Sequence, residues 1–384
     1  MFAARLCVAL GALLWLGAVA AEPPLVALGD AELRRVLAHG PWPVAAARDP
    51  SNRVSGNAGA FAFGERLFND PRLSRDGTRA CATCHQRERG FSDGLPRAEG
   101  LQRGDRNTPA LLNVGGQRWF GWDGANDNLW AQSLRPLLDA REMGGTLQTV
   151  AQTLRSQPDL RAAYAEVFGA VALRGDEAVA VNLAKALAAY QETLRSGRTA
   201  FDAYRDALAR GDAEAAKAYP SAAQRGLAIF VGKGRCHVCH SGPKFSNGEF
   251  HDIGIPFFVE RGRVDRGRQG GIKALQASRY NLLGPFSDDA SRRSAISTRH
   301  VRPEHRNYGE FKVPSLRSVA RSAPYMHIGS LASLRHVVRH YSELDEERLH
   351  SDGERLLVPL RLSAAETDDL VDFLLSLNER EPAR

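Results

Sequence analysis

Cys81-Ala82-Thr83-Cys84-His85 and Cys236-His237-Val238-Cys239-His240 are two copies of one pattern, C-x-x-C-H, and they decide the fold of this 384-residue chain. Two thiols at this spacing can form thioether bonds to one edge of a porphyrin, and the His that follows can ligate its iron. A pair of C-x-x-C disulfide motifs is the competing interpretation, but such motifs need no His after either pair. The sequence therefore predicts two covalently bound haem c groups, with His85 and His240 as the proximal iron ligands.

The sequences around the two motifs are similar, which indicates an internal duplication. A segment from Gly to Phe precedes each motif, and an aromatic residue with a turn follows each motif at nearly equal distance. The paired segments are Gly64-Glu65-Arg66-Leu67-Phe68 with Gly226-Leu227-Ala228-Ile229-Phe230, and Gly90-Phe91-Ser92-Asp93 with Lys244-Phe245-Ser246-Asn247. We expect an N-terminal haem domain over residues 22–197 and a C-terminal haem domain over residues 198–384.

The first 21 residues are typical of a cleavable export signal. One Arg precedes an apolar run from Leu6 to Val19, and small residues stand around the end of this run at positions 18, 20 and 21. The run is shorter than the roughly 20 residues that a membrane-spanning helix needs, and no later stretch is apolar enough to span a bilayer. We expect a periplasmic protein without a membrane anchor, from which residues 1–21, including Cys7, are removed.

The charge of the chain narrows the choice of partners. The formal net charge is +7 and the pI is about 9.3, which predicts a basic surface. A basic surface can attract nucleic acid, but an exported protein rarely meets any, and the charges form no dense basic run. Two interpretations of the basic surface remain: it binds an acidic partner protein, or it is a solvated surface without a specific role.

Helical periodicity is the main signal outside the haem motifs. Apolar residues recur at helical spacing from Leu183 to Leu194, and a further helix is expected from residue 200 to about residue 218. Ser363 and Glu366 form a capping box ahead of an apolar stripe, which predicts an amphipathic helix packed on the second haem domain.

Two long segments, 86–128 and 241–324, are rich in Gly, Pro, Asn and Arg and show little of the alternation that strands need. We expect them to form loops around buried haems. The predicted fold class is mainly α, with two c-type cytochrome domains and long loops around two covalently bound haems.

Five further motifs make the chain resemble the bacterial di-haem cytochrome c peroxidases and their MauG-like relatives. They are Phe68-Asn69-Asp70-Pro71-Arg72-Leu73-Ser74, Arg106-Asn107-Thr108-Pro109, Trp122-Asp123-Gly124, and Phe311-Lys312-Val313-Pro314-Ser315-Leu316-Arg317 with Pro324-Tyr325-Met326-His327. The resemblance runs over most of the chain after residue 21. It implies a peroxide-dependent oxidoreductase.

The resemblance also implies an acid–base group on the open face of the first haem. In the family this group follows the Trp between the haems at steps of ten residues; Trp122, Gln132 and Glu142 have that spacing, with Pro136 between them as in MauG. Glu142 would take a proton from bound peroxide and return it to the leaving oxygen, while Gln132 orients the peroxide. Trp122 would carry electrons between the haems. Without the shared spacing, Glu142 would be interpreted as a surface carboxylate and Trp122 as a core residue.

A calcium ion between the haems is a further implication of the resemblance. Its protein ligands would be Asn107 and the backbone carbonyls of Ser322 and Pro324, since a hard cation prefers oxygen ligands. Ser322 stands where Thr is common, but a backbone carbonyl ligand tolerates that change.

Two departures distinguish the chain from many conventional di-haem peroxidases. Between Gln86 and Asn107 there is no His that could bind the first iron, so this iron is expected to be open without reductive activation. The position seventeen residues after Pro324, where the peroxidases have a Met ligand to the second iron, is Tyr341, as in MauG. Phenolate lowers the potential of a haem, whereas thioether favours ferrous iron. Met326 is the rival ligand, and a plain helical role is the alternative for Tyr341.

The remaining histidines carry less information. His327 belongs to the family motif, and we expect it beside the second haem without a catalytic role. The others form no metal-ligand spacing, so surface or packing roles are expected for His251, His300, His305, His336 and His340.

The leading hypothesis is an enzyme that uses hydrogen peroxide to form a high-valent di-haem state and then oxidises a residue on a periplasmic partner protein. The segment from Trp119 to Trp130 resembles the MbnH-type branch, which implies a partner Trp that is converted to a kynurenine. The alternative is a di-haem cytochrome c peroxidase that reduces hydrogen peroxide with electrons from a small redox protein. A third possibility, a pure electron-transfer or haem-sensing module, needs neither the Gln132 and Glu142 pair nor an open iron.

Overall fold

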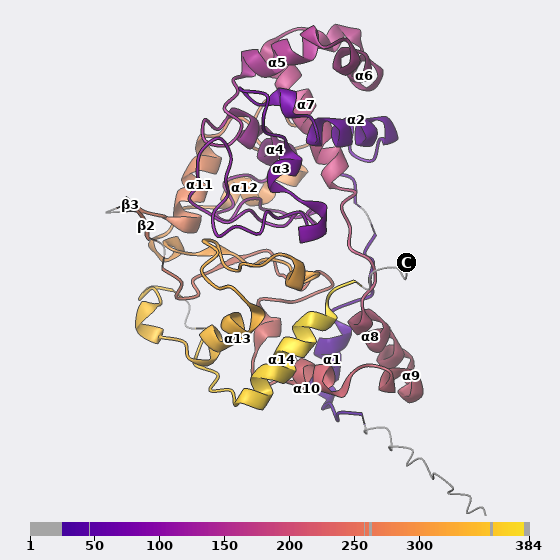
Figure 1. Cartoon of the computed structure of the whole chain (residues 1–384), viewed down its shortest axis with the longest axis vertical. Helices are drawn as coiled ribbons and strands as arrows, with labels where there is room; N and C mark the ends of the chain where they lie inside the picture. The colour runs from indigo at the N-terminus through magenta and orange to yellow at the C-terminus, as the bar shows by residue number, and fades with distance from the viewer. Residues whose placement is uncertain (1–24, 46, 257, 261–262, 354–355, 380–384) are drawn as a thin grey trace, which may run out of the picture.

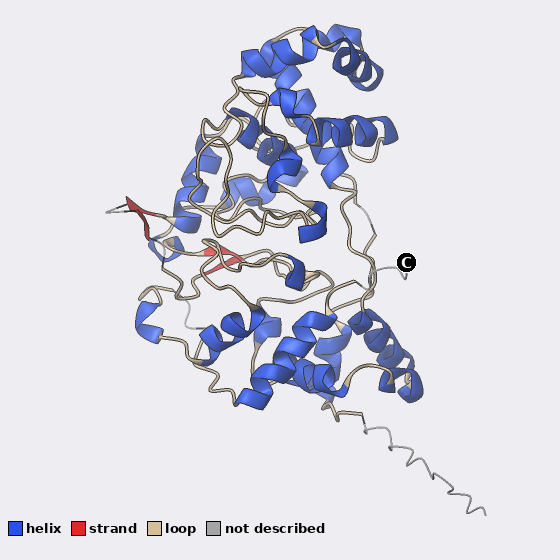
Figure 2. Ribbon diagram, in the orientation of Figure 1, coloured by secondary structure: helices blue, strands red, loops and turns tan. Residues whose placement is uncertain are grey.

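A computed structural model describes residues 25–45, 47–256, 258–260, 263–353 and 356–379. The predicted export signal, residues 1–21, lies outside the described residues. Helices dominate, which confirms the mainly α prediction (Figure 2). The α-helices are α1 (Asp30–Leu37), α2 (Ala58–Phe68), α3 (Cys81–Cys84), α4 (Leu129–Leu138), α5 (Leu147–Ser156), α6 (Pro158–Phe168), α7 (Asp176–Gln191), α8 (Ala200–Arg210), α9 (Ala213–Lys217), α10 (Ser221–Val231), α11 (Gly267–Ala277), α12 (Ile296–His300), α13 (Leu334–Ser342) and α14 (Ala364–Ser376).

The helices gather in two lobes with loops between them (Figure 1). The upper lobe of Figure 1 contains α2 and α4 to α7, and the lower lobe contains α1, α8 to α10, α13 and α14. Each lobe has its own group of buried apolar side chains. The largest include Trp130 and Tyr164 in the upper lobe, and Phe201, Phe230 and Phe373 in the lower lobe.

In each lobe the helix that leads to a haem motif crosses a second helix at a glycine. A Cβ atom on Gly64 of α2 would lie 2.1 Å from the carbonyl oxygen of Ala186 in α7. A Cβ atom on Gly226 of α10 would lie 1.9 Å from the carbonyl oxygen of Asp369 in α14. Only glycine, which has no Cβ atom, permits this close approach of two helix backbones. The two similar sequence segments therefore both begin with a glycine for the same packing reason.

The capping box predicted at Ser363 and Glu366 is confirmed, and the helix it begins, α14, packs against α10 in the lower lobe. The single helix predicted from residue 200 to residue 218 is wrong. Helix α8 ends at Gly211, which has a φ of 68°, and α9 begins after Asp212, whose side chain caps it. Glycine adopts this left-handed conformation without steric cost, so it ends the helix despite the continuing helical pattern.

Each half of the chain contributes a segment to the other lobe. Helix α1, from the N-terminal half of the chain, packs against α8 and α10 of the lower lobe. In the upper lobe, buried Lys185 donates to the carbonyl oxygen of Phe286 at 2.7 Å and pairs with Asp288 at 2.6 Å. Asp127 accepts the backbone N–H of Leu282. The domain boundary at residues 197 and 198 stays a prediction, and the two lobes exchange segments across it.

The strands are short. Strand β1 (Phe250–His251) pairs with β4 (Phe311–Lys312), and β2 (Phe258–Glu260) pairs with β3 (Arg263–Val264), both antiparallel. These strands, together with α11 and α12, interrupt the loop that was expected over residues 241–324.

Candidate active site

The first haem motif forms the short helix α3, with Cys81 and Cys84 one turn apart and both free of disulfides. The His85 ring bonds through Nδ1 to the carbonyl oxygen of Phe91 at 2.8 Å. When Nδ1 donates in this way, the neutral ring keeps the lone pair of Nε2 for a metal ion. Burial lowers the pKa of His85, which favours the neutral ring that a metal requires.

The second haem motif repeats this arrangement around a 3₁₀-helix, η4 (Cys236–Val238). The His240 ring bonds through Nδ1 to the carbonyl oxygen of Phe245 at 3.0 Å, and burial lowers the pKa of His240 to about 4. Phe91 and Phe245, which carry the two accepting carbonyls, have φ values of 61° and 52°. The duplicated segments therefore use the same unusual backbone turn to orient the two imidazoles.

Both motifs open into one cavity of about 1220 Å³. Single small-molecule sites usually enclose roughly 300–1,000 Å³, so this cavity has room for more than one bulky group. All the residues predicted for the site line it: Cys81, Cys84, His85, Asn107, Trp122, Gln132, Pro136, Glu142, Cys236, Cys239, His240, Ser322, Pro324 and Tyr341. The fold thus brings together residues that are spread over most of the sequence.

Several polar groups on the cavity wall fit the anionic propionates of a haem. His327 is 1% exposed and stacks on Phe311 with 3.5 Å between ring centroids, yet neither ring nitrogen has a hydrogen-bond partner. The Nε of Arg79 is also buried without a partner. Lys312 donates to the neutral oxygens of Gln117 and Trp119, and burial lowers its pKa to about 8. A carboxylate would supply the acceptor that the buried nitrogens of His327 and Arg79 lack, and a negative charge beside Lys312.

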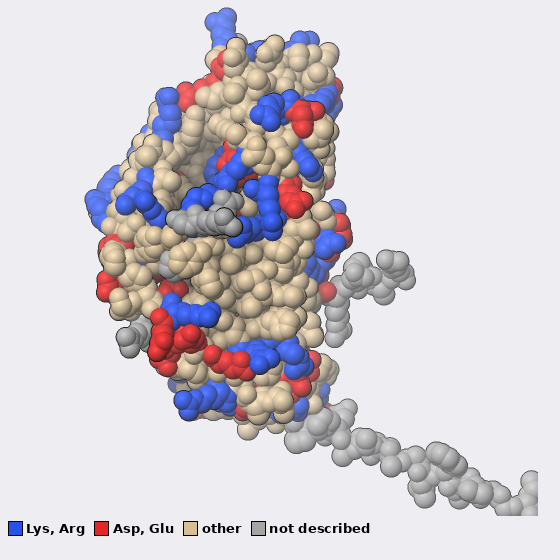
Figure 3. All heavy atoms as spheres, turned by 60° about the vertical axis from the view of Figure 1, so that its left-hand side comes forward, with Lys and Arg blue, Asp and Glu red and all other residues tan. Residues whose placement is uncertain are grey.

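The surface of the molecule near its middle is also basic. Figure 3 shows Lys and Arg side chains beside a hollow in the upper half of one face, and a group of Asp and Glu side chains lower down. The cavity wall itself includes Arg106, Arg141 and Arg263. Each of these three Arg side chains forms an ion pair with an Asp that also lines the cavity: Arg106 with Asp123 and Asp265, and both Arg141 and Arg263 with Asp105.

Helix α4 presents Gln132 and Pro136 on one face, because residues four apart in a helix lie one turn apart. The carboxamide oxygen of Gln132 accepts a hydrogen bond from the Nδ2 of Asn126 at 2.9 Å. This bond sets the orientation of the amide, so its NH₂ group is the part left to donate into the cavity. Asn128 caps the helix by accepting the backbone N–H of Ala131.

Glu142 lies in the turn that follows α4. Its backbone N–H donates to Asp139, and its carbonyl oxygen accepts the N–H of Leu101. Its carboxylate pairs with Arg135 at 2.9 Å. Burial raises the pKa of Glu142, and Arg135 offsets part of that rise. Glu142 lines the same cavity as Cys81 and Cys84, whose pKa is raised mainly by burial and further by the Glu142 charge.

Trp122 is anchored at both its ring and its backbone. The indole N–H donates to the carbonyl oxygen of Asn107 at 2.8 Å, and the backbone carbonyl accepts the N–H of Lys312. The side chain of Asn107 donates through Nδ2 to the carbonyl oxygen of Leu95. Its Oδ1 atom keeps lone pairs that could accept a hydrogen bond or bind a cation. Ser322 lines the same cavity.

Tyr341 lies on α13 beside the second haem motif. Burial raises the pKa of its phenol, and the nearby thiols of Cys236 and Cys239 raise it further. Met326, the rival ligand, also lines the cavity and has a φ of 74°.

One buried residue at the site gave no signal in the sequence. His39, which follows α1, is 2% exposed and bonds through Nε2 to the carbonyl oxygen of His240 at 3.0 Å. Its ring packs on Phe245 with 4.5 Å between centroids. Because 201 positions separate His39 from His240, no local pattern could connect them.

Comparison with known proteins shows the family. Methylamine utilization protein MauG of Methylorubrum extorquens is 36% identical to this chain over 324 residues, which cover 84% of this chain and 78% of that protein. This chain belongs to the MauG and di-haem cytochrome c peroxidase family. The family model described as di-haem cytochrome c peroxidase matches residues 58–210. Cytochrome-c peroxidase IdrP1 of Pseudomonas sp. strain SCT is 31% identical over 333 residues, which cover 85% of this chain and 82% of that protein.

A solved structure of this family has the same fold. It is a MauG-like protein associated with microbial copper homeostasis, with a TM-score of 0.66 and 26% identity, and the match covers 88% of this chain and 96% of that one. Membership makes this chain a peroxide-dependent di-haem oxidoreductase, and the family implies haem c cofactors. Among the described residues, none of the helices combines the length and the apolar character that a membrane span requires.

Proposed function

We propose that this chain is a periplasmic enzyme that uses hydrogen peroxide to oxidise a Trp residue on a small partner protein. The observation that carries the proposal is the position of Tyr341 on α13, where it lines the same cavity as Cys236, Cys239 and His240 of the second haem motif. A phenol at this position favours the storage of an oxidising equivalent over rapid electron uptake from a small cytochrome. The similarity to MauG and to a MauG-like protein of copper homeostasis supports the same class of reaction.

In this proposal residues 22–197 form the peroxidatic domain and residues 198–384 the electron-transfer domain. Cys81, Cys84 and His85 would hold the first haem c, and Cys236, Cys239, His240 and Tyr341 the second. When bound, the haems supply the redox chemistry in which peroxide takes up two electrons and two protons and yields two waters. The export signal expected at residues 1–21 supports the periplasmic location.

Glu142 would hold and move the proton in this reaction. Its pKa is raised by burial and it lines the same cavity as the first motif, so it can accept a proton from peroxide and return it to the departing oxygen. Gln132 would orient the peroxide through its NH₂ group, and Pro136 would shape the wall one turn further along α4.

Trp122 would connect the two haems electronically, since it lies in the cavity that both motifs share. The Oδ1 of Asn107 and the carbonyls of Ser322 and Pro324 are proposed as calcium ligands. A cation there would neutralise part of the negative charge of the haem propionates.

The second candidate function is a di-haem cytochrome c peroxidase with a small redox protein as electron donor. The 31% sequence identity to a cytochrome-c peroxidase of Pseudomonas sp. supports this second function. Tyr341, and the lack of His between Gln86 and Asn107, favour the first proposal.

A peroxide experiment separates the two functions. The holoprotein is mixed with one equivalent of hydrogen peroxide, and then either with a reduced small c-type cytochrome or with a Trp-containing protein encoded beside it. The proposed function predicts slow cytochrome oxidation and a modified Trp in the partner, detected by mass spectrometry. Rapid oxidation of the cytochrome with an unmodified partner would establish the peroxidase instead.

A further inference from the structure

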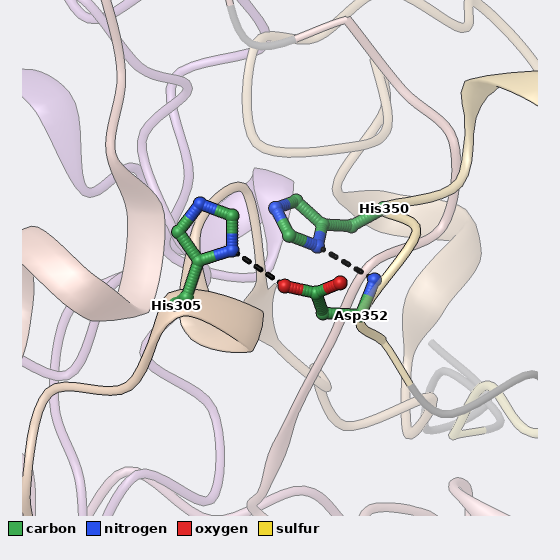
Figure 4. A group of neighbouring side chains, drawn as sticks. All are labelled: His305, His350 and Asp352. Atoms are coloured by element: carbon green, nitrogen blue, oxygen red, sulfur yellow. Dashed lines mark hydrogen bonds and ion pairs between the residues drawn. The ribbon is translucent and has the colours of Figure 1, made fainter.

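Three side chains with metal-binding groups meet at the surface of the C-terminal half. His305, His350 and Asp352 each offer one ligand atom, and these atoms lie within 4.8 Å of one another. Figure 4 shows the three side chains pointing toward one another from two separate segments. His305 begins a 3₁₀-helix, η6 (His305–Asn307), whereas His350 and Asp352 follow a second one, η8 (Glu346–Arg348).

The hydrogen bonds within the cluster show how a cation would fit. The Nδ1 of His305 bonds to Oδ2 of Asp352 at 2.7 Å. The backbone N–H of Asp352 donates to Nδ1 of His350 at 3.2 Å, so this nitrogen carries no proton and its lone pair accepts that N–H. A metal ion that replaced the proton between His305 and Asp352 would also have to replace the Asp352 N–H at Nδ1 of His350, a long hydrogen bond, to gain the second imidazole as a ligand.

Both ligand-bearing segments are held in position by other hydrogen bonds. Asp252 accepts the backbone N–H of His350 at 2.7 Å through one carboxylate oxygen and that of Gly254 at 2.9 Å through the other. In η6 the side chain of Asn307 accepts the N–H of Glu304 at 2.9 Å. Ligands that are ordered before binding lose little conformational freedom when the ion arrives.

We propose that His305, His350 and Asp352 bind one divalent transition metal ion, Zn²⁺ or Cu²⁺. Two imidazoles with one carboxylate suit these ions, whereas Ca²⁺ and Mg²⁺ prefer ligands that are all oxygen. Three protein ligands leave at least one position for water, as in open metal sites. The side chains of His305 and Asp352 are 74% and 56% exposed, so an ion can reach them from solvent.

The bound ion would connect two segments at the rim of the haem cavity. His350 lines that cavity, and so do Glu304, Arg306 and Glu310 on the side of η6. The ion would thus fix the loop of residues 349–353 against η6. The site uses none of the residues of the peroxide reaction proposed above, so its test is independent of that reaction.

The test is metal binding to the holoprotein, prepared without a polyhistidine tag and freed of loosely bound metals. Zn²⁺ and Cu²⁺ are titrated separately by equilibrium dialysis with elemental analysis, and the Cu²⁺ form is examined by electron paramagnetic resonance. His305→Ala and Asp352→Asn remove one ligand each. His336→Ala, at an exposed His of α13 outside the cluster, is the matched control. Unchanged haem spectra show that each variant is folded.

We expect one ion per chain beyond the haem iron in the wild type and in His336→Ala. The Kd should rise about 100-fold in His305→Ala and in Asp352→Asn, since the loss of even an outer hydrogen bond at a metal site costs roughly 10–100-fold. Tighter binding of Cu²⁺ than of Zn²⁺ would follow the usual order of affinities. Hydrogen exchange of the backbone amides of His350 and Asp352 should slow when the ion binds. Absence of stoichiometric binding, or equal affinity in His305→Ala and the wild type, would overturn the proposal.

Discussion

The indole N–H of Trp122 donates to the backbone carbonyl of Asn107 at 2.8 Å. Because this bond uses the backbone of Asn107 and its Nδ2 donates to Leu95, the side-chain Oδ1 is left for the cation proposed above. The residue proposed to connect the haems is therefore held by a residue proposed to bind calcium. A change at either position is expected to affect the other.

Trp122→Phe should leave peroxide binding at the first haem intact but reduce the sharing of charge between the haems. The lost hydrogen bond also leaves the Asn107 carbonyl without its donor, which should cost about 1–3 kcal/mol of stability. A redox titration that follows both haems measures the coupling. Trp119→Phe, at another Trp of the cavity wall, is the control and should keep the coupling. Equal coupling in Trp122→Phe and the wild type would remove Trp122 from the electron path.

Glu142→Gln should slow the reaction of the first haem with hydrogen peroxide by roughly 100-fold or more, because general acid–base groups typically contribute about 10²–10⁴-fold. Stopped-flow spectroscopy of the haem absorption measures this rate. Glu343→Gln, the same substitution at an exposed Glu after α13, should have no effect. A wild-type rate in Glu142→Gln would exclude Glu142 as the proton carrier.

Arg135→Gln should move the pH dependence of the peroxide reaction. Burial raises the pKa of Glu142, and Arg135 lowers it in part, so removal of Arg135 should raise this pKa further. The reaction needs the carboxylate to accept a proton, so its rate increases as the pH rises through the pKa of Glu142. The increase should therefore occur at higher pH in the variant. A rate profile across the pH range checks this, and a shift toward lower pH would contradict the role of Arg135.

Tyr341→Met should raise the reduction potential of the second haem by on the order of 0.1 V or more, since axial ligands control a range of roughly 0.8 V. Thioether favours ferrous iron, whereas phenolate favours ferric iron. Spectroelectrochemistry of the two variants Tyr341→Met and Tyr341→Phe measures the potential. An unchanged potential and spectrum in both variants would show that Tyr341 does not bind the iron.

Arg317→Ala should be strongly destabilising. Arg317 forms two hydrogen bonds with Asp202, at 3.0 and 2.8 Å, and the two side chains are 0% and 2% exposed. Removal of one partner leaves a buried charge, which typically costs about 3–5 kcal/mol. Chemical denaturation of the holoprotein measures the loss.

The control for this pair is Arg339→Ala. Arg339 pairs with Glu343 one turn away on the surface, with side chains that are 67% and 62% exposed. Exposed pairs of this kind contribute about 0.3–0.5 kcal/mol. Similar midpoints for the Arg317 and Arg339 variants would contradict the interpretation of the buried pair.

Local patterns in the sequence were sufficient for the parts of the protein that depend on near neighbours. The C-x-x-C-H motifs, the helical periodicity and the capping box at Ser363 each involve residues within one or two turns, so their chemistry can be read directly. The family resemblance also predicted the residues of the site, and all of these residues line one cavity. The helix predicted across Gly211 failed because one residue with a positive φ outweighed the periodic pattern.

Contacts between distant segments were decided by the tertiary structure alone. The exchange of segments between the lobes, the bond from His39 to His240, and the meeting of His305 with His350 and Asp352 join residues far apart in the chain. No spacing rule connects such residues, since loop geometry and the packing of whole helices set their positions. The amino-acid sequence by itself determined which chemical groups are present and how each motif folds locally. Only the folded chain decided which of these groups line one cavity, form an ion pair or meet in one cluster.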